Sequence, residues 1–212
     1  KAGRIAGSNS PVLVYGETGT GKELLVQAIH NSDPKRKNKP FIAQNCAALP
    51  FTLLESILFG TAEGSFTGAK DNPGLFELAH GGTLYLDEVN SLNTELQAKL
   101  LRVIQDGVVR RVGAAKTKDV DVRIIASTNE HPEELVKKKL LREDLYYRLN
   151  VIYLELPPLR ERKEDIDALV KHFIDRNNES LGKKVTGASE EVIKVFEEYP
   201  WPGNVRELEH LV

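Results

Sequence analysis

Residues Val12–Leu25 have the sequence VLVYGETGTGKELL. Four apolar residues end at Gly16, two further glycines lead to Lys22, and leucines then recur at helical spacing. A strand, a glycine-rich turn ending in Gly-Lys and a helix together form a P-loop arrangement. The sequence therefore predicts a phosphate-binding loop at the carboxyl end of a buried strand.

The residue types of this loop suit an anion. Glycines let successive backbone N–H groups point inward at a phosphate, and the following helix adds the positive end of its dipole. Lys22 supplies a point charge for the terminal phosphates. Glu23 stands where the common pattern has Ser or Thr, so magnesium must be held from elsewhere. The candidate nucleotide-binding residues are Gly16, Glu17, Thr18, Gly19, Thr20, Gly21, Lys22 and Glu23.

Two carboxylates, Asp87 and Glu88, follow the apolar strand Thr83–Leu86. A carboxylate at the end of a buried strand in a P-loop protein is well placed for Mg²⁺, and we assign this role to Asp87. Its neighbour Glu88 can polarise a water. The alternative is a strand end with solvated charges, which the P-loop makes less favoured. Thr128 and Asn129 close another core strand and are candidates for sensing the γ-phosphate or orienting the attacking water.

The hydrophobic pattern predicts an α/β fold with a five-stranded parallel sheet between helices, because strands and helices alternate. The five strands are expected at 12–15, 41–45, 83–86, 122–127 and 151–156. Helices are expected after the P-loop, over 51–59, 73–79, 93–105 and 142–149, and from Pro132. Two short strands, 108–112 and 120–122, are expected to flank a polar tip, Gly113–Lys118. Beyond Leu159 the pattern is helical over 163–181, 189–199 and 204–212. We predict two domains, 1–158 and a smaller helical domain, 159–212.

The composition excludes several classes of protein. The single cysteine, Cys46, rules out a disulfide framework and fits a reducing cytoplasm. No apolar run reaches membrane length, and a net charge of −2 argues against a DNA-wrapping surface. The 212 residues contain no methionine, so we expect the chain to be a fragment of a longer protein.

Residues Gly60–Asn72, GTAEGSFTGAKDN, have the composition of a loop. One aromatic residue and one hydroxyl lie among small residues, which suits a tip that contacts another protein closely. The alternative is that Phe66 folds back into a core. The flanking glycines favour the contact tip.

Together these segments resemble the AAA+ ATPase domain of the sigma-54-dependent transcriptional activators, the bacterial enhancer-binding proteins, over nearly the whole chain. The similar motifs are GETGTGKE at 16–23, GGTLYLDEVN at 81–90, WPGNVREL at 201–208 and GSFTGA at 64–69. The last resembles the GAFTGA loop by which this family engages sigma-54. Ser65 replaces the usual alanine, whereas Phe66 and Thr67 are present. The glutamate after the P-loop lysine is normal in this family.

The resemblance implies an AAA+ P-loop NTPase with a helical lid that hydrolyses ATP to ADP and phosphate with Mg²⁺. It implies that Asn45 pairs with Glu88 in the off state and that Thr128 and Asn129 form the first sensor. Arg142 and Arg148 match arginines that reach into the neighbouring subunit. Further roles follow from the motifs: Arg206 as second sensor, Gly113–Lys118 as a loop that moves with the GSFTGA loop, and sigma-54 contact through Gly64, Ser65, Phe66, Thr67, Gly68 and Ala69.

The implied partners are sigma-54 with its RNA polymerase holoenzyme and further copies of the chain, in a ring of six or seven. The expected location is the cytoplasm, with no membrane contact, and DNA is reached only through a C-terminal domain absent from this chain. Two alternatives stay open: a generic AAA+ remodeller, and a nucleotide-binding module with little turnover, for which Glu23 is the only support. Arg142 and Arg148 taken alone read as surface charges, and Trp201–Gly203 as a packed turn.

Overall fold

The computed structural model describes residues 5, 7–65 and 70–212. Phe66, Thr67, Gly68 and Ala69, at the centre of the predicted sigma-54 loop, therefore lie outside the described residues. Contacts divide the chain into two compact units. The first consists of residues 1–15 and 23–154, and the second of 16–22 and 155–212. The predicted division after residue 158 stays a prediction.

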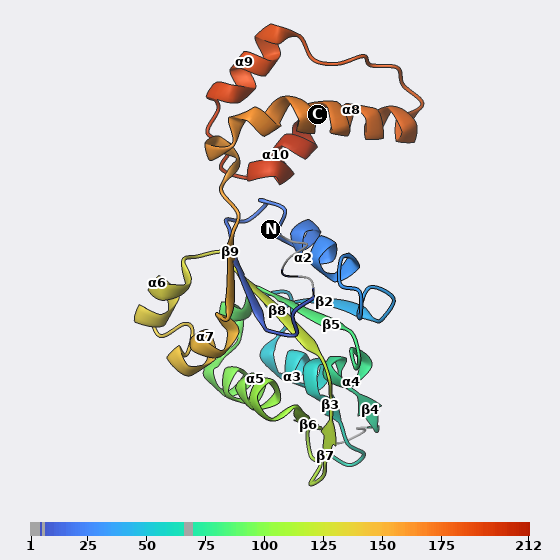
Figure 1. Cartoon of the computed structure of the whole chain (residues 1–212), viewed down its shortest axis with the longest axis vertical. Coiled ribbons are helices and arrows are strands. Elements are labelled where there is room, and N and C mark those ends of the chain that lie inside the picture. Colours follow the sequence, from blue (N-terminus) through green and yellow to red (C-terminus); the bar gives the residue numbers. More distant parts are fainter. Residues whose placement is uncertain (1–4, 6, 66–69) are drawn as a thin grey trace. The chain divides into compact units, whose positions relative to one another are not determined.

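The first unit is built on a five-stranded sheet in the order β2-β5-β8-β1-β9 (Figure 1). The pairings of β2 with β5, β5 with β8 and β8 with β1 are parallel, which confirms the predicted architecture. Every residue of β8 is buried, because helices cover both faces of the sheet. The strands are β1 (Val12–Tyr15), β2 (Phe41–Asn45), β5 (Thr83–Asp87), β8 (Arg123–Thr128) and β9 (Ile152–Glu155).

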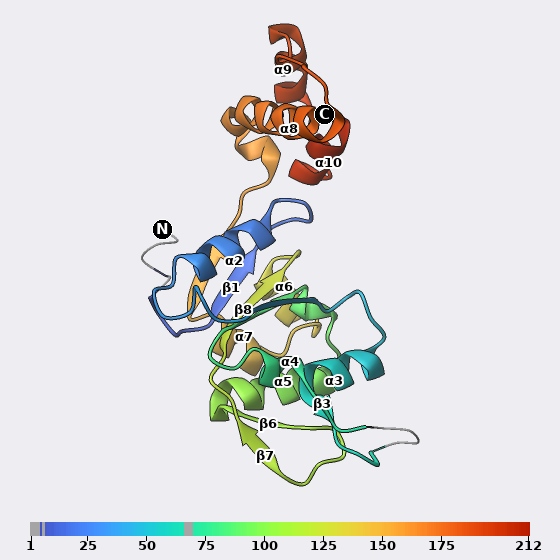
Figure 2. The ribbon, with the colours of Figure 1, turned by 90° about the vertical axis from the view of Figure 1, so that its right-hand side faces the viewer.

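Helices lie on the two faces of this sheet, with α2 on one side and α3, α4 and α5 on the other (Figure 2). The longest helix of the unit, α5 (Thr94–Asp106), begins where the Asn93 side chain accepts a hydrogen bond from Leu96 N at 2.9 Å. It ends at Gly107, whose φ of 66° favours glycine. The others are α2 (Lys22–Asn31), α3 (Phe51–Phe59), α4 (Leu75–Leu78), α6 (Pro132–Lys137), α7 (Glu143–Leu149) and the 3-10 turn η1 (Val89–Ser91).

Two small antiparallel pairs extend from the unit: β3 (Gly60–Thr61) with β4 (Asn72–Pro73), and β6 (Val108–Arg110) with β7 (Thr117–Asp119). The predicted strand at 120–122 is wrong, since β7 lies three residues earlier. All three β7 residues are exposed, so the strand lacks the apolar alternation on which the prediction relied. The helix predicted from Pro73 begins only at Leu75, because Pro73 pairs in β4.

Glu77 on α4 forms ion pairs with residues in and beside the β6–β7 hairpin. Its carboxylate accepts hydrogen bonds from Arg111 Nε at 2.6 Å and Nη2 at 2.8 Å, and from Lys118 Nζ at 2.7 Å. Arg111 also pairs with Asp71 at 2.6 Å. The Arg111 hydrogen bonds, together with Lys118, hold the pKa of Glu77 at about 2. The two-residue strand β4 and the β6–β7 hairpin are thus joined to α4 by charge.

The ion pairs of Glu77 predict that the stability of the fold depends on pH. The pKa of Glu77 in the folded state lies below its ordinary value of 4.5, so the carboxylate stabilises the fold above about pH 4.5, and this stabilisation is lost as the pH falls towards 2. Glu77→Gln should lower the free energy of unfolding at pH 7 by on the order of 2–3 kcal/mol. Urea titrations at a series of pH values from 7 to 2.5 measure this effect. The difference in the free energy of unfolding between Glu77→Gln and wild type should shrink as the pH falls. Glu134→Gln, which removes an exposed carboxylate, is the control; a difference that stays constant with pH would contradict the assignment.

The second unit contains the residues that follow β9. Three helices, α8 (Ile166–Leu181), α9 (Glu190–Glu198) and α10 (Asn204–Leu211), follow the 3-10 turns η2 (Leu159–Glu161) and η3 (Lys163–Asp165). Their core includes Leu159, Phe173, Leu208 and Trp201, whose indole donates to Phe196 O at 2.6 Å. The predicted helical unit is confirmed. In the described part of the chain, no helix has the length and apolar character needed to cross a membrane.

Candidate functional site

The carboxyl ends of four strands meet at one edge of the sheet. The register pairs Asn45 of β2 with Asp87 of β5, and Tyr15 of β1 with Thr128 of β8. In open α/β sheets this edge is where ligands bind. The structure thus brings together Asn45, Asp87, Glu88, Thr128 and Asn129, which the sequence singled out from separate segments.

Asp87 is held by two side chains that sequence reasoning missed. Its Oδ1 accepts hydrogen bonds from Tyr85 OH at 2.9 Å and from Ser127 Oγ. Its Oδ2 accepts a long hydrogen bond, 3.3 Å, from Asn45 Nδ2. Burial raises the pKa of Tyr85, and the negative charge of Asp87 adds to this, so the phenol stays a donor. Tyr85 lies in the middle of β5 and Ser127 one residue before the end of β8, so the pattern of polar residues at strand ends did not mark them.

The carboxylate fits a magnesium ion. Mg²⁺ keeps several waters and takes one or two protein carboxylates together with substrate phosphates. Asp87 Oδ2 is the weakly engaged atom, while Oδ1 is oriented by Tyr85 and Ser127. Within the described residues there is no cluster of three or more His, Cys, Asp or Glu side chains that would form an all-protein cage. The donor set therefore suits Mg²⁺ that is held jointly with a phosphate.

Glu88 stands on strained backbone, with φ of 55° in the left-handed region. Such a conformation costs on the order of 1–3 kcal/mol in a non-glycine residue and is found at functional sites. Its N–H donates to Ser127 Oγ at 3.4 Å, and its Oε1 accepts from Asn129 Nδ2 at 3.4 Å. In this structure the Asn45 side chain donates a hydrogen bond to Asp87, whereas the side-chain amide that donates to Glu88 is that of Asn129.

Two polar atoms beside this cluster are buried without a hydrogen-bond partner: Thr128 Oγ1 and Asn129 Oδ1. A buried unpaired oxygen costs free energy, so a native structure that retains one deserves a reason. A ligand or water that donates to these atoms would satisfy them. The backbone N–H of Cys46 donates to Asp87 O at 2.9 Å, and burial, with the charges of Asp87 and Glu88, raises the pKa of the Cys46 thiol to about 12. The thiol is therefore inert at neutral pH.

The P-loop belongs to the second unit, where Lys22 is buried. Its Nζ donates to Gly16 O at 2.7 Å and to Glu17 O at 3.2 Å, within the loop itself. Thr20 Oγ1 donates to Glu17 O at 2.8 Å. The ammonium therefore lies in the curl of the loop, where a phosphate oxygen would exchange for these carbonyls. Glu23, the first residue of the other unit after the loop, is exposed and bonded by Gln27 at 3.2 Å.

Residues of the helical unit hold the P-loop backbone, and sequence reasoning missed most of them. Arg160 pairs with both carboxylate oxygens of Glu17, at 2.6 and 2.8 Å, and lowers the pKa of Glu17. Arg162 donates to Thr20 O at 2.7 Å. Asn204 Nδ2 donates to Glu17 Oε2 at 3.2 Å and to Thr18 O at 3.0 Å. These lid side chains therefore orient the loop that would carry the phosphates.

Arg206, the predicted second sensor, also lies here, and its backbone N–H donates to Gly19 O at 3.3 Å. Gly19 has φ of 82°, and a Cβ at this position would collide with Gly203 O. Only glycine allows this approach of the loop to the start of α10.

Arg142 directly precedes α7, and Arg148 lies in its last turn. The Arg142 guanidinium pairs with Asp144, at 3.0 and 2.7 Å, and is partly exposed. Arg148 is exposed, and its Nη2 makes a weak 3.5 Å contact with Ile104 O at the end of α5. Both arginines thus reach the surface, one at the start of this short helix and one in its last turn.

Gly64 and Ser65 are the two described residues of the GSFTGA motif. The base of this loop and the β6–β7 hairpin share backbone hydrogen bonds, from Ala62 N to Val112 O at 3.0 Å and from Val112 N to Gly60 O at 2.9 Å. Gly113 has φ of 77°, and a Cβ there would collide with Ser65. The two predicted loops therefore touch, and glycine at position 113 makes the contact possible.

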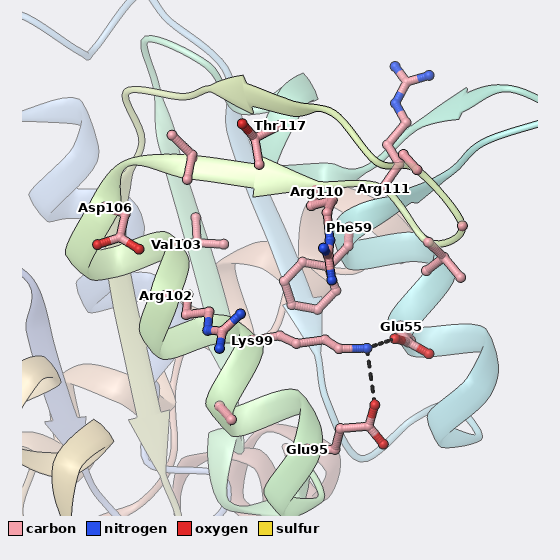
Figure 3. Close-up of a pocket in the computed structure, with 15 residues that line it drawn as sticks. Glu55, Phe59, Glu95, Lys99, Arg102, Val103, Asp106, Arg110, Arg111 and Thr117 are labelled. Carbon is pink, nitrogen blue, oxygen red and sulfur yellow. Dashed lines mark hydrogen bonds and ion pairs between the residues drawn. The ribbon is translucent and has the colours of Figure 1, made fainter.

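A cavity of about 710 Å³ lies between α3, α5 and the β6–β7 hairpin (Figure 3). Phe59 lines it, and Lys99 spans it to pair with Glu55 and, at 3.1 Å, with Glu95. Its walls are the elements that carry the two loops. It is lined by none of the carboxylate-edge residues, so it is separate from the candidate nucleotide site.

Known proteins share this sequence and fold. The family described as the sigma-54 interaction domain matches residues 1–155, and the AAA+ ATPase lid domain matches residues 160–212. The chain is 57% identical over 211 residues to the transcriptional activator RocR of Bacillus subtilis, covering 100% of this chain and 46% of RocR. It is 51% identical over 210 residues to the Nif-specific regulatory protein of Azospirillum brasilense, covering 99% of this chain and 33% of that protein.

The fold is likewise shared with solved structures. NtrX from Brucella abortus in complex with ADP superposes with a TM-score of 0.91 at 39% identity, covering 99% of this chain and 46% of that one. NtrX in complex with ATP gives a TM-score of 0.90. The chain thus spans less than half the length of these relatives. The matched family models, the parallel sheet and the helical lid show that this chain belongs to the sigma-54 interaction family of AAA+ ATPase domains found in bacterial transcriptional activators.

Proposed function

We propose that this chain binds ATP with Mg²⁺, hydrolyses it to ADP and phosphate in a ring of its own copies, and uses the hydrolysis to remodel sigma-54 RNA polymerase for promoter opening. The observation that carries this proposal is the pair Asp87 and Glu88 at the carboxyl edge of the sheet, with separate partners for each carboxylate. Hydrolysis needs two acids with different roles, and their different surroundings support that division.

Each group has one task in this proposal. Asp87 Oδ2 holds the magnesium ion, which neutralises charge on the phosphates. Glu88 polarises the attacking water, and Asn129 orients Glu88 and the water. Lys22 and the loop residues Gly19–Gly21 hold the phosphates. The crystal structures of NtrX with ADP and with ATP support a nucleotide of this kind.

Arg142 and Arg148 act on the nucleotide of a neighbouring subunit, and Arg206 reads the nucleotide of its own. Arg142, which is partly exposed just before α7, and Arg148, which is exposed in its last turn, are both accessible, and this supports a role across an interface. A ring is the closed form of such a head-to-tail contact. A hexamer or heptamer satisfies this requirement equally.

Sigma-54 is the proposed partner of the Gly64–Ala69 loop. The match to the sigma-54 interaction domain supports it, as does the contact between Ser65 and Gly113 that links the loop to the β6–β7 hairpin. Because the partner is RNA polymerase, the proposed location is the cytoplasm. We assign DNA contact to a C-terminal domain outside this chain.

The experiment is a measurement of ATPase rate per subunit across protein concentration. If Arg142 completes the site of a neighbour, the rate per subunit should rise with concentration through the assembly range, by on the order of 10³-fold between monomer and ring. Sedimentation velocity at the same concentrations reports assembly. A rate that stays flat while the ring forms would contradict the trans site, and the absence of hydrolysis in assembled rings would favour the nucleotide-binding module.

A further inference from the structure

Helix α5 carries a buried amide that the proposed roles do not use. Gln97 is 2% exposed and lies one turn into the helix. Its Nε2 donates to Leu92 O at 2.7 Å and to Leu140 O at 2.8 Å, and its Oε1 accepts from Arg142 N at 2.8 Å. Burial of an amide in a core is costly unless its hydrogen bonds are made. Here both Nε2 protons and one lone pair of Oε1 are used.

The first of these bonds leads to the catalytic edge of the sheet. Leu92 follows η1, the 3-10 turn that leaves Glu88. Within that turn Ser91 N donates to Glu88 O at 2.9 Å and Leu92 N donates to Val89 O at 3.2 Å. The carbonyl that accepts from Gln97 is therefore the end of a short turn that begins at Glu88 and is closed by two backbone hydrogen bonds.

The other two bonds lead to the segment that carries Arg142. Gln97 bonds Leu140 O and Arg142 N, the backbone groups on either side of Leu141. Leu141 itself is 1% exposed and anchored in the core. The segment enters from Lys139, whose φ of 58° is in the left-handed region, so this backbone needs external support.

We propose that Gln97 is a positioning residue for Arg142, and that it links the Glu88 turn of one subunit to the arginine that this subunit offers to its neighbour. The inference rests on the proposed function, in which Arg142 acts in trans. One rigid amide spans the two segments, so a displacement of the Glu88 turn is transmitted to the backbone of Arg142.

The amide chemistry distinguishes this role from simple packing. Leucine fills a similar volume but leaves Leu92 O, Leu140 O and Arg142 N without the side-chain partner. Glutamate has the same shape but places a carboxylate against two carbonyl oxygens. Either change releases the Arg142 backbone, and a displacement of about 1 Å at a reacting centre can cost on the order of 100-fold in rate.

The experiment begins with Gln97→Leu and Gln97→Glu. Each should lower kcat on the order of 100-fold while the KM for ATP changes by less than about threefold, because the subunit's own nucleotide contacts remain. Gln105→Leu, the same substitution at an exposed position of α5, is the matched control and should retain the wild-type rate. If circular dichroism shows both Gln97 variants to be unfolded, Gln97 is a folding determinant and the inference is overturned.

Mixed rings then locate the defect. Glu88→Gln mixed with Arg142→Ala tests the trans role itself, since each subunit supplies what the other lacks. With equal random mixing, up to roughly a quarter of the sites are complete. Gln97→Leu has an intact Glu88 and a displaced arginine, so it should be rescued to a similar level by Glu88→Gln and should not be rescued by Arg142→Ala.

The outcomes separate the two claims. No rescue in the Glu88→Gln and Arg142→Ala mixture would overturn the trans role of Arg142 and this inference with it. Rescue there, with Gln97→Leu rescued by Arg142→Ala instead, would mean that Gln97 acts on Glu88 of its own subunit. Rescue of Gln97→Leu by neither partner would mean a defect in both segments. Each of the last two results would overturn the assignment to Arg142 while leaving the proposed function intact.

Discussion

Glu88→Gln is expected to retain ATP binding and to lose turnover by on the order of 10³-fold, because it removes a base without changing the shape of the side chain. The strained backbone at Glu88 and its bond to Asn129 place the carboxylate, and neither depends on its charge alone. Binding is measured with a fluorescent ATP analogue, and turnover by phosphate release.

Two comparisons make this result specific. Lys22→Ala should weaken nucleotide binding itself, since it removes the charge in the curl of the P-loop. Glu95→Gln, the same substitution on an α5 carboxylate that is paired with Lys99, should change neither quantity. If Glu88→Gln hydrolysed ATP at the wild-type rate, another group would have to activate the water.

Thr67→Ala should leave the ATPase rate within about twofold of wild type and abolish nucleotide-dependent binding of sigma-54. Thr67 lies in the part of the GSFTGA loop outside the described residues, and the expected effect follows from the chemistry of its side chain and that of Phe66. A covered Phe66 contributes roughly 1.5–3 kcal/mol, and the Thr67 hydroxyl adds about 1 kcal/mol, or more where its loss leaves a buried partner unpaired. The loss of this bond should therefore fall on partner binding.

The measurement is capture of purified sigma-54 with and without a transition-state analogue of ATP. Thr52→Ala, at an exposed position of α3, is the matched control and should bind sigma-54 as wild type does. Loss of ATPase with retained sigma-54 binding is the opposite pattern. It would assign the loop to the nucleotide site and remove the most specific support for the sigma-54 partner.

The local order of apolar and polar residues was sufficient to predict the parallel sheet and the edge of that sheet at which Asp87 and Glu88 lie. The central strands β1, β5 and β8 are buried runs that are mostly apolar, β5 and β8 end in polar residues, and parallel strands present their carboxyl ends at the same edge. Asp87, Glu88 and Asn129 were therefore predictable as neighbours from the sequence. β7 was misplaced because Thr117–Asp119 is exposed throughout and carries no periodic signal.

The fold class and the residue types at the strand ends could be predicted from the order of apolar and polar residues, since both follow from short-range periodicity. The side chains that hold those residues in place became visible only in the folded chain. Tyr85 and Ser127 orient Asp87 from neighbouring strands, and Arg160 reaches Glu17 across 143 positions of the chain. Gln97 looks like any polar residue of an amphipathic helix until its three partners converge on it. These contacts join segments distant in sequence, and a hydrogen bond between such segments leaves no trace in the local order of apolar and polar residues.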